Sequence, residues 1–529
     1  MTIEFASADL VEGLLSPSAY PHEVGEVELV ETHISWVFLT GEYAYKIKKP
    51  VDFGFLDFTT LEKRRHYCEE EVRLNRSWAP DLYLDVVPIT VVGGNPCIAG
   101  QGTPIEHAVR MRQFGYDMRL DRQLAIGELG AEDMLELATE IARQHLNAKR
   151  VKPSERLLQV TKQQIRDNYE SLAGEVPDAF LSAQRRWMES KLDDYGPVID
   201  ERSKEGFFRE CHGDLKLANI VRLPEGIRAF DCIEFNRDLR EIDVVADYAF
   251  LTMDLKVRGA TNLASVFLNR YLELTGDYRG ACLLPIYEVY RSLVRAKILG
   301  IKLREVGATD SAASDRSAMK RYCALARSLT MQRRPILVAM TGYSGSGKSW
   351  LSTRLIPGLA AIRLRSDLER KRLAGLSPAA DSKSGIETGI YDRGITGAVY
   401  EQLLDTAGEL LRAGLNVIVD ASFLSASHRR LARRTAERSG AEFALVRTVA
   451  AQAELHKRLK RRNKGANVSE ADIAVLRHQL SSADPLAADE LDTAITVDTE
   501  EEIDISELTS EIHRSRPPCP ALTELPEAI

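Results

Sequence analysis

The sequence predicts two domains in succession, an α+β domain followed by an α/β domain built on a parallel sheet. The length of 529 residues is the first observation, because single hydrophobic cores stop growing at about 250–300 residues. The second is a change of pattern near residue 331. Before it, strand-like runs lead into a long helical region, and after it short apolar runs alternate with helical patterns, as parallel strands with crossover helices do.

The composition narrows the functional classes. The chain has 70 basic and 78 acidic residues, a net charge of −8, so a general nucleic-acid-binding surface is not expected, although a local basic patch stays open. Seven cysteines without a CxxC spacing argue against a zinc site or a disulfide framework and fit the reducing cytosol. No lysine or arginine precedes Lys46, and no apolar run reaches the roughly 18 residues of a membrane span. We therefore expect a cytoplasmic protein without a membrane partner.

The first 115 residues predict a small sheet that carries one long helix. Alternating side chains over residues 26–50 indicate a strand, a turn and a strand. An amphipathic pattern predicts a helix over Thr60–Trp78, and two further strand-like runs, Leu82–Val92 and Glu106–Met111, flank a turn rich in glycine and proline. Residues 131–205 and 240–330 predict a helical body around a loop-rich stretch, 207–238.

The loop-rich stretch contains His212-Gly213-Asp214, then Asn219, and then Asp231 after two short apolar runs that predict a hairpin. This order resembles the catalytic loop of aminoglycoside and choline phosphotransferases, which are relatives of protein kinases. The resemblance implies a two-lobed protein-kinase-like fold over residues 1–331, with a small lobe of about 1–115 and a helical lobe of about 116–331. It also implies that Asp214 orients and deprotonates an acceptor hydroxyl and that Asn219 and Asp231 hold magnesium.

The same resemblance assigns roles in the small lobe. Lys46, at the end of Tyr43-Ala44-Tyr45-Lys46, is expected to contact the α- and β-phosphates of the nucleotide, with Lys48 as the alternative. Glu71 is its expected ion-pair partner and Glu70 the alternative, while a solvated acidic helix face stays open.

Two segments of this lobe are expected to face the nucleotide. Met111, within Arg110–Phe114, lies where the interlobe hinge should offer backbone groups to adenine. No glycine-rich loop precedes Lys46, so the turn at Thr32–Ser35 is expected to cover the phosphates instead.

The second domain opens with a GxxxxGK[ST] motif between the apolar run Ile336–Met340 and a helical pattern, the context in which this motif is specific. Its backbone N–H groups are expected to form an anion nest at a helix N-terminus. The nest residues are Gly342, Tyr343, Ser344, Gly345, Ser346 and Gly347. Lys348 should reach the β- and γ-phosphates, and the hydroxyl of Ser349 should ligate magnesium.

Two aspartates follow strand-like runs in this domain. Asp367 comes after Ala360–Leu364 and could accept a proton from an attacking hydroxyl, or cap the next helix, or both. Asp420 follows Val417–Val419 and could hold magnesium through water or contact the acceptor. Both should lie at the carboxyl edge of the sheet, where α/β folds bind ligands.

A basic stretch at residues 457–464 completes the second domain. Arg458, Arg461 and Arg462 are expected to neutralise charge that develops during phosphoryl transfer. A solvated helix face and nucleic-acid binding are the alternatives. Together with the glycine motif, Asp367 and Asp420, this stretch resembles small P-loop kinases of the gluconate kinase, zeta-toxin and polynucleotide-kinase type, and we expect this domain over residues 332–513, before a proline-rich tail at 514–529.

Taken whole, the chain resembles bacterial proteins that fuse an aminoglycoside-phosphotransferase-like domain to a P-loop ATP-binding kinase domain. This resemblance implies ATP and Mg²⁺, and we expect two nucleotide sites and transfer of a γ-phosphoryl group to a hydroxyl of a small metabolite. Two alternatives stay open: a kinase-like ligand sensor that regulates a catalytic P-loop domain, and a polynucleotide or tRNA kinase. The sequence leaves the acceptor and the oligomeric state open.

Overall fold

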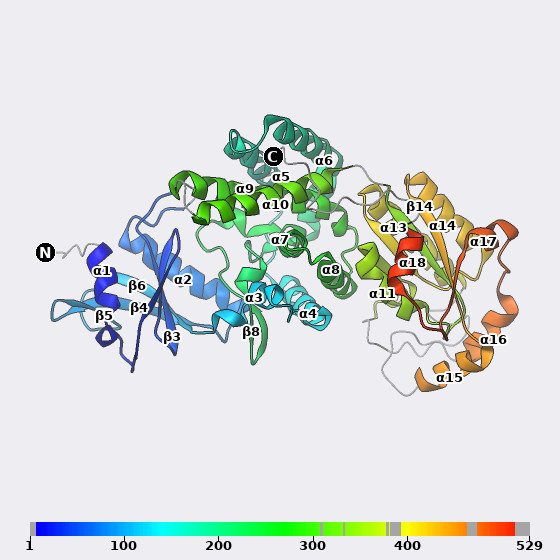
Figure 1. The fold of residues 1–529 in the computed structure, drawn as a ribbon, viewed down its shortest axis with the longest axis horizontal. Helices are drawn as coiled ribbons and strands as arrows, with labels where there is room; N and C mark the ends of the chain where they lie inside the picture. Colours follow the sequence, from blue (N-terminus) through cyan, green and yellow to red (C-terminus); the bar gives the residue numbers. More distant parts are fainter. Residues whose placement is uncertain are drawn as a thin grey trace. The chain divides into compact units, whose positions relative to one another are not determined.

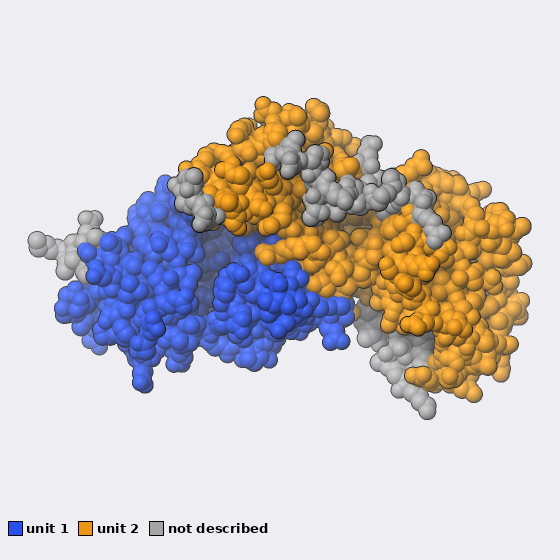
Figure 2. All heavy atoms as spheres, in the orientation of Figure 1, with its two compact units in different colours: residues 1–164, 196–254 blue, residues 165–195, 255–529 orange. Residues whose placement is uncertain are grey.

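Figure 1 shows the fold in a computed structural model, which describes residues 7–54, 56–306, 310–331, 334–376, 380, 393–462 and 473–513. The chain forms two compact units, residues 1–164 with 196–254 and residues 165–195 with 255–529 (Figure 2). These units follow contacts in space and place the helices of residues 255–330 with the P-loop region. The predicted boundary at residue 331 rests on the motifs and stays a prediction. The predicted tail, 514–529, lies outside the described residues.

The first unit contains a six-stranded antiparallel sheet in the order β1-β2-β3-β6-β4-β5. Its strands are β1 (Glu28–Glu31), β2 (Ser35–Leu39), β3 (Tyr43–Lys48), β4 (Tyr83–Val92), β5 (Asn95–Ile98) and β6 (Glu106–Arg112). The expected pair of strands over residues 26–50 is thus a set of three. β5 lies inside the expected turn, and its Pro96 is tolerated because β5 is the edge strand and proline lacks only an N–H.

The long helix predicted after the first hairpin is α2 (Leu61–Trp78). It begins where Thr60 caps it, since the Thr60 side chain accepts a bond from the backbone N–H of Lys63. Cys68 and Val72 of α2 are buried in one cluster with Val109 and Met111 of β6. This packing fixes the charged face of α2 relative to the sheet.

Between the first sheet and residue 331 the chain is mostly helical, and the stretch of the predicted catalytic loop adds four short strands. The helices of this part are α3 (Leu120–Ala125), α4 (Ala131–Asn147), α5 (Glu155–Leu172), α6 (Asp178–Glu205), α7 (Val244–Val257), α8 (Thr261–Thr275), α9 (Leu284–Val306) and α10 (Asp310–Thr330). Helix α1 (Ser7–Leu14) instead packs on the first sheet, where its Leu10 and Leu14 are buried. β7 (Phe208–Glu210) pairs with β10 (Glu241–Asp243), and β8 (Ile220–Leu223) forms the predicted hairpin with β9 (Gly226–Ala229).

The P-loop region contains a five-stranded parallel sheet in the order β12-β13-β11-β14-β15, which confirms the predicted α/β class. Its elements are β11 (Ile336–Thr341), α11 (Lys348–Leu359), β12 (Ala361–Arg365), α12 (Ser366–Leu373), α13 (Arg393–Arg412), β13 (Asn416–Asp420), α14 (Ala426–Arg438), β14 (Glu442–Val449), α15 (Gln452–Arg462), α16 (Ile473–Ser482), α17 (Ala488–Thr493), β15 (Ile495–Asp498) and α18 (Ile505–Ile512). The chain leaves central strand β11 straight into the glycine motif, at the carboxyl edge of the sheet.

Successive side chains of β11 point to opposite faces of the sheet, and helices pack on both faces. Ile336, Val338 and Met340 are buried in one cluster with α11 and α18, and α13 and α14 contact the sheet as well. Burial on both faces explains why these strands appear in the sequence as continuous apolar runs. Over the described residues, we find no helix with both the length and the apolar character needed to cross a bilayer. The six cysteines among them are free thiols.

Candidate active site

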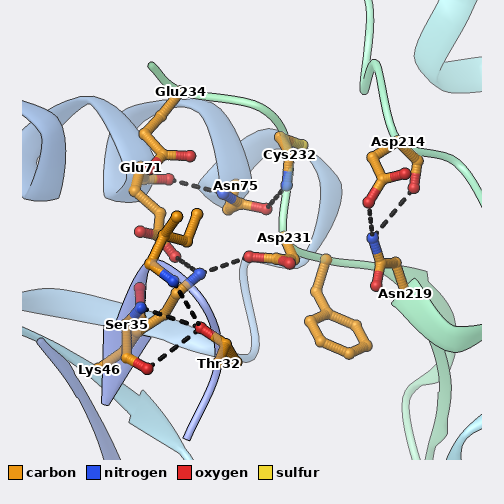
Figure 3. Close-up of polar contacts among 12 residues, drawn as sticks. Thr32, Ser35, Lys46, Glu71, Asn75, Asp214, Asn219, Asp231, Cys232 and Glu234 are labelled. Atoms are coloured by element: carbon orange, nitrogen blue, oxygen red, sulfur yellow. Dashed lines mark hydrogen bonds and ion pairs between the residues drawn. The ribbon is translucent and has the colours of Figure 1, made fainter. Parts of the chain in front are cut away.

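Lys46 of β3 joins α2 to the segment that follows the β8–β9 hairpin. Its Nζ lies 2.8 Å from Glu71 Oε1 and also contacts Asp231 Oδ1 (Figure 3). The ion pair expected for Lys46 therefore forms with Glu71, which is fully buried. Glu70, the alternative, pairs with Arg73 instead. Three residues that are far apart in the sequence therefore meet at one ammonium group.

Lys48, the alternative to Lys46, lies deeper on the same strand face. Its side chain is 1% exposed and its Nζ lies 2.8 Å from Glu71 Oε2 and contacts Glu234 Oε1. Lys48 is therefore enclosed by two carboxylates, and Lys46 is the lysine that reaches Asp231.

The charges of this group hold one another in place. Burial alone would lower the pKa of Lys46, but Asp231 and Glu71 raise it well above its usual value. Burial would likewise raise the pKa of Asp231, but the Lys46 ammonium lowers it to about 2. Burial raises the pKa of Glu234 despite Lys48. Lys46 and Asp231 thus stay charged at neutral pH.

Asp214 and Asn219 face each other across the predicted catalytic loop. Asn219 Nδ2 donates to Asp214 Oδ2 over 2.8 Å and to the Asp214 backbone O over 3.0 Å (Figure 3). The Lys216 ammonium contacts Asp214 Oδ2 as well. Since the Asn219 amide nitrogen is used in this way, its Oδ1 is the atom that can serve a cation, and amide and carboxylate oxygens are the ligands that Mg²⁺ prefers.

Buried acids from α7 brace the backbone of this loop. Asp247 accepts bonds from the N–H groups of His212 (3.0 Å) and Gly213 (2.8 Å), and Asp254 accepts one from Leu217 (3.0 Å). Gly213 has φ 84°, and a Cβ there would lie 2.8 Å from the Leu239 carbonyl oxygen. The loop therefore requires both the acids and the glycine.

His212 has a structural environment. Its Nε2 lies 2.8 Å from the carbonyl oxygen of Phe230, and its Nδ1 accepts from the N–H of Asp214 over 3.3 Å. Burial lowers the pKa of this imidazole, so it is neutral in the folded protein at neutral pH. It positions Asp214 by accepting a hydrogen bond from the Asp214 backbone N–H.

Apolar side chains of the sheet and of the β8–β9 hairpin share one cluster beside these charges. Met111 is buried there with Val221 and Leu223, and the rings of Phe114 and Phe230 meet edge to face at 5.1 Å. Met111 itself lies between β3 and β4, opposite Ala44 and Tyr83. Its expected backbone contact with adenine stays a prediction.

The turn expected to cover the phosphates is ordered by its own threonine. Thr32 Oγ1 accepts from the N–H of Ser35 over 2.9 Å and donates to the Ser35 carbonyl oxygen over 3.1 Å (Figure 3). The turn thus has a defined backbone without a glycine.

The glycine motif of the second site adopts backbone angles that only glycine tolerates well. Gly342, Gly345 and Gly347 have φ of 145°, 85° and 93°, and a Cβ on Gly342 would lie 2.6 Å from the Thr448 carbonyl oxygen. Lys348 donates from Nζ to the carbonyl oxygens of Gly342 and Tyr343, both over 2.8 Å. The loop is therefore closed around its own lysine.

The two aspartates predicted for this site come from neighbouring strands. Asp420 ends β13 and accepts a bond from Ser352, one turn after Ser349, over 3.2 Å. Asp367 lies in the first turn of α12, directly after β12, which pairs with β13. Both stand at the carboxyl edge, as expected, and Asp420 is tied to the helix that begins at Lys348.

The basic stretch at residues 457–464, expected to neutralise charge during transfer, is only partly within the described residues. Arg458 reaches the glycine motif, with Nη1 3.4 Å from the Gly345 carbonyl oxygen and 2.7 Å from Thr499 Oγ1. Arg461 is exposed at the same end of α15. The Arg462 side chain and residues 463–464 lie outside the described residues. Arg458 is the residue of this stretch that the structure brings to the loop.

Sequence reasoning missed three charged residues that these sites contain. Lys216 contacts Asp214, Glu234 contacts Lys48, and Arg363 of β12 donates to the carbonyl oxygen of Ser349 over 3.4 Å. Lys216 lies two residues after Asp214 inside the motif, which could have drawn attention to it. The other two partners are set by folding, and nothing local marks them.

A family model and curated relatives match this chain. Residues 337–486 match the family described as AAA domain. The uncharacterized proteins Rv2004c of Mycobacterium tuberculosis and Mb2027c of Mycobacterium bovis are each 30% identical over 418 residues, which are 78% of this chain and 81% of the relative.

Among solved structures, a choline/ethanolamine kinase family protein from Mesorhizobium loti is 14% identical and covers 57% of this chain and 92% of its own, with a TM-score of 0.35. A gluconokinase from Sinorhizobium meliloti is 21% identical and covers 34% of this chain and 91% of its own, with a TM-score of 0.24.

Proposed function

The chain belongs to the family of the uncharacterized mycobacterial protein Rv2004c, and we propose that it is an ATP-dependent phosphotransferase with two nucleotide sites. In this proposal, it transfers the γ-phosphoryl group of ATP to a hydroxyl of a small molecule. The observation that carries the proposal is the meeting of Lys46, Glu71 and Asp231 in the same compact unit as the Asp214–Asn219 pair. Phosphoryl transfer depends on such positioning and charge, and little covalent chemistry is asked of the protein.

Each residue of the first site has a task in this reaction. Lys46, held by Glu71, neutralises charge on the nucleotide phosphates, and Asn219 and Asp231 offer oxygen atoms to magnesium. Bound magnesium would neutralise the charge that builds on the phosphates during transfer. Asp214 accepts the proton of the attacking hydroxyl, while Lys216, beside its Oδ2, stands where it can neutralise the transferring group.

The second site would act by the same chemistry with different parts. The N–H groups of Gly342–Gly347 and the ammonium of Lys348 hold phosphates, Ser349 and Asp420 hold magnesium directly or through water, and Asp367 accepts the acceptor's proton. Arg458 already contacts the motif, and its guanidinium can turn from the Gly345 carbonyl oxygen to a phosphate.

One observation favours a second candidate, in which the first unit senses a ligand and regulates the P-loop site. The turn expected to cover the phosphates is built on Thr32 and Ser35 without glycine, and fewer backbone N–H groups could then approach the phosphates closely. A polynucleotide or tRNA kinase has less support, because Arg458 of the basic stretch is engaged with Thr499 and Gly345.

A screen of sugars, nucleosides and amino alcohols for stimulated ADP release tests the proposal. We expect at least one compound to accelerate ADP release by the natural protein, and Asp214→Asn or Asp367→Asn to remove that stimulation. If Asp214→Asn leaves every stimulated activity intact while Asp367→Asn abolishes it, the sensor function replaces the first proposal. RNA binding with a steep salt dependence would favour the nucleic-acid kinase.

A further inference from the structure

Helix α8 contacts the edge of the P-loop sheet through the side-chain amide of Asn269. Asn269 Nδ2 donates to the carbonyl oxygen of Ala361 over 2.8 Å, and its Oδ1 accepts from the N–H of Arg363 over 2.7 Å. β12 is the edge strand of the sheet, and these are the bonds that a neighbouring strand would make. The amide therefore closes this edge and fixes α8 against β12.

Glu273 lies one turn further along α8 and binds two arginines of β12. Its Oε1 is 2.7 Å from Arg363 Nη2 and 3.6 Å from Arg365 Nη1. The Glu273 and Arg363 side chains are only 11% and 7% exposed. Removing one partner of such a buried pair leaves an uncompensated charge, so the position of Arg363 depends on Glu273.

Arg363 continues the connection to the beginning of α11. Its Nη1 lies 3.4 Å from the carbonyl oxygen of Ser349, 3.2 Å from Ser352 Oγ and 2.5 Å from Thr353 Oγ1. Because the guanidinium is a rigid planar fork, holding Nη2 at Glu273 also fixes where Nη1 meets these three oxygens.

The same group of charges reaches the second aspartate of the site. Ser352 Oγ donates to Asp420 Oδ2 over 3.2 Å, and Arg365 Nε lies 3.9 Å from that oxygen. One carboxylate on α8 is thus linked through two arginines to both residues that should serve magnesium at the P-loop.

We propose that Glu273 is a positioning residue for the P-loop site. By holding Arg363 and Arg365, it sets the placement of Ser349 and Asp420 and thereby the affinity of this site for a magnesium nucleotide. The inference rests on the proposed function in that Ser349 and Asp420 are taken to serve a nucleotide. It adds that a helix of residues 261–275, far from the motif in sequence, controls that affinity, while Asn269 holds the sheet edge.

Calorimetric titration of the full chain with ADP, with magnesium or with a chelator, tests this inference. The parent protein carries Lys46→Ala, so that the first site does not contribute. Glu273→Gln keeps the size of the side chain but removes its charge, and we expect about tenfold weaker binding of Mg·ADP and a smaller change for ADP alone. Arg363→Lys can still pair with Glu273 but cannot hold three oxygens, so we expect the same pattern.

Glu409→Gln is the matched control. It breaks the ion pair between Arg279 Nε and Glu409 Oε2, 3.0 Å apart, which involves neither Ser349 nor Asp420, so Mg·ADP should bind as in the parent. If Glu273→Gln does not fold, Arg363→Lys decides. A parent that does not bind Mg·ADP contradicts the proposed P-loop function itself. A parent that binds, together with variants that melt earlier but keep its ratio of Mg·ADP to ADP affinity, overturns the positioning role alone.

Discussion

Two lysines of β3 meet the same glutamate but differ in their other contacts. Lys46 joins Glu71 to Asp231, whose side chain is 41% exposed, whereas Lys48 lies between Glu71 and Glu234 with 1% of its side chain exposed. The first arrangement presents an ammonium group beside an accessible carboxylate. The second arrangement is buried. Replacing Lys46 should therefore affect nucleotide binding, whereas replacing Lys48 should affect stability.

We predict that Lys46→Ala abolishes nucleotide binding at the first site with little loss of stability, because Lys48 still neutralises Glu71. Lys48→Met should instead lower the free energy of unfolding by about 3–5 kcal/mol, since it leaves two buried carboxylates with one lysine. Nucleotide titration and denaturant unfolding of both variants measure this difference. Equal effects of the two substitutions on both quantities would contradict it.

The second residue-scale prediction concerns pH. Burial lowers the pKa of His212, whereas in the unfolded chain a histidine titrates near about 6.5. The unfolded state therefore binds more protons below that pH, and the free energy of unfolding should fall as the pH drops through about 6.5. His212→Gln should make this dependence shallower. Denaturant unfolding between about pH 5 and 8 measures it, and identical slopes for both proteins would refute the assignment.

At the scale of elements, the sequence predicted those helices and strands whose formation depends on residues close together in the chain. The helical spacing of apolar residues and the N-cap Thr60 predict α2. The short apolar runs after residue 331 predict the parallel strands of the second sheet. β5 was not predicted because its residues, Asn95-Pro96-Cys97-Ile98, have the composition of a turn. The proline is tolerated because β5 is an edge strand, where the missing N–H need not cost a hydrogen bond of the sheet. β5 in fact pairs with β4 across the two-residue turn Gly93-Gly94, with Val92 opposite Asn95, and this local hairpin signal was overlooked because the whole glycine- and proline-rich stretch was interpreted as a turn.

The residues of the candidate sites also fall into those that a local motif predicts and those that only the fold reveals. Asp214, Asn219 and Lys348 lie in compact motifs, so spacing alone points to them. Glu234 and Glu273 act through partners more than 80 residues away in the chain. Only folding brings those charges together, and the sequence carries no local signal for them.

The glycine motif gives an element-scale prediction. Gly342→Ala should abolish nucleotide binding at the P-loop, because Gly342 has φ 145° and the new Cβ would lie 2.6 Å from the Thr448 carbonyl oxygen. Gly414→Ala is the control, since Gly414 also has positive φ (88°) but open space around its Cβ position. It should cost about 1 kcal/mol of stability and leave binding intact. Titration of Mg·ADP into both variants, each made in the Lys46→Ala background so that the first site does not contribute, measures this, and normal binding by Gly342→Ala would contradict the proposed phosphate-binding role of the motif.

At the scale of the whole molecule, we expect two separate nucleotide sites. The full chain should bind two nucleotides, whereas Lys46→Ala and Lys348→Ala should each bind one, because each lysine belongs to a different motif. Equilibrium binding of labelled nucleotide at saturation gives the stoichiometry. A single site in the natural protein that only Lys348→Ala removes would support the sensor function of the first unit.

The most direct test of the central claim follows the phosphoryl group itself. ATP labelled in its γ-phosphate is incubated with the protein and the compound that stimulates ADP release, and the products are separated. The account predicts labelled acceptor from the natural protein, and at least about a hundredfold less from Asp214→Asn or Asp367→Asn, whichever serves that acceptor, because each removes a proton acceptor. Label that appears only as free phosphate, at equal rates in all three proteins, would contradict the claim that this chain is a phosphotransferase.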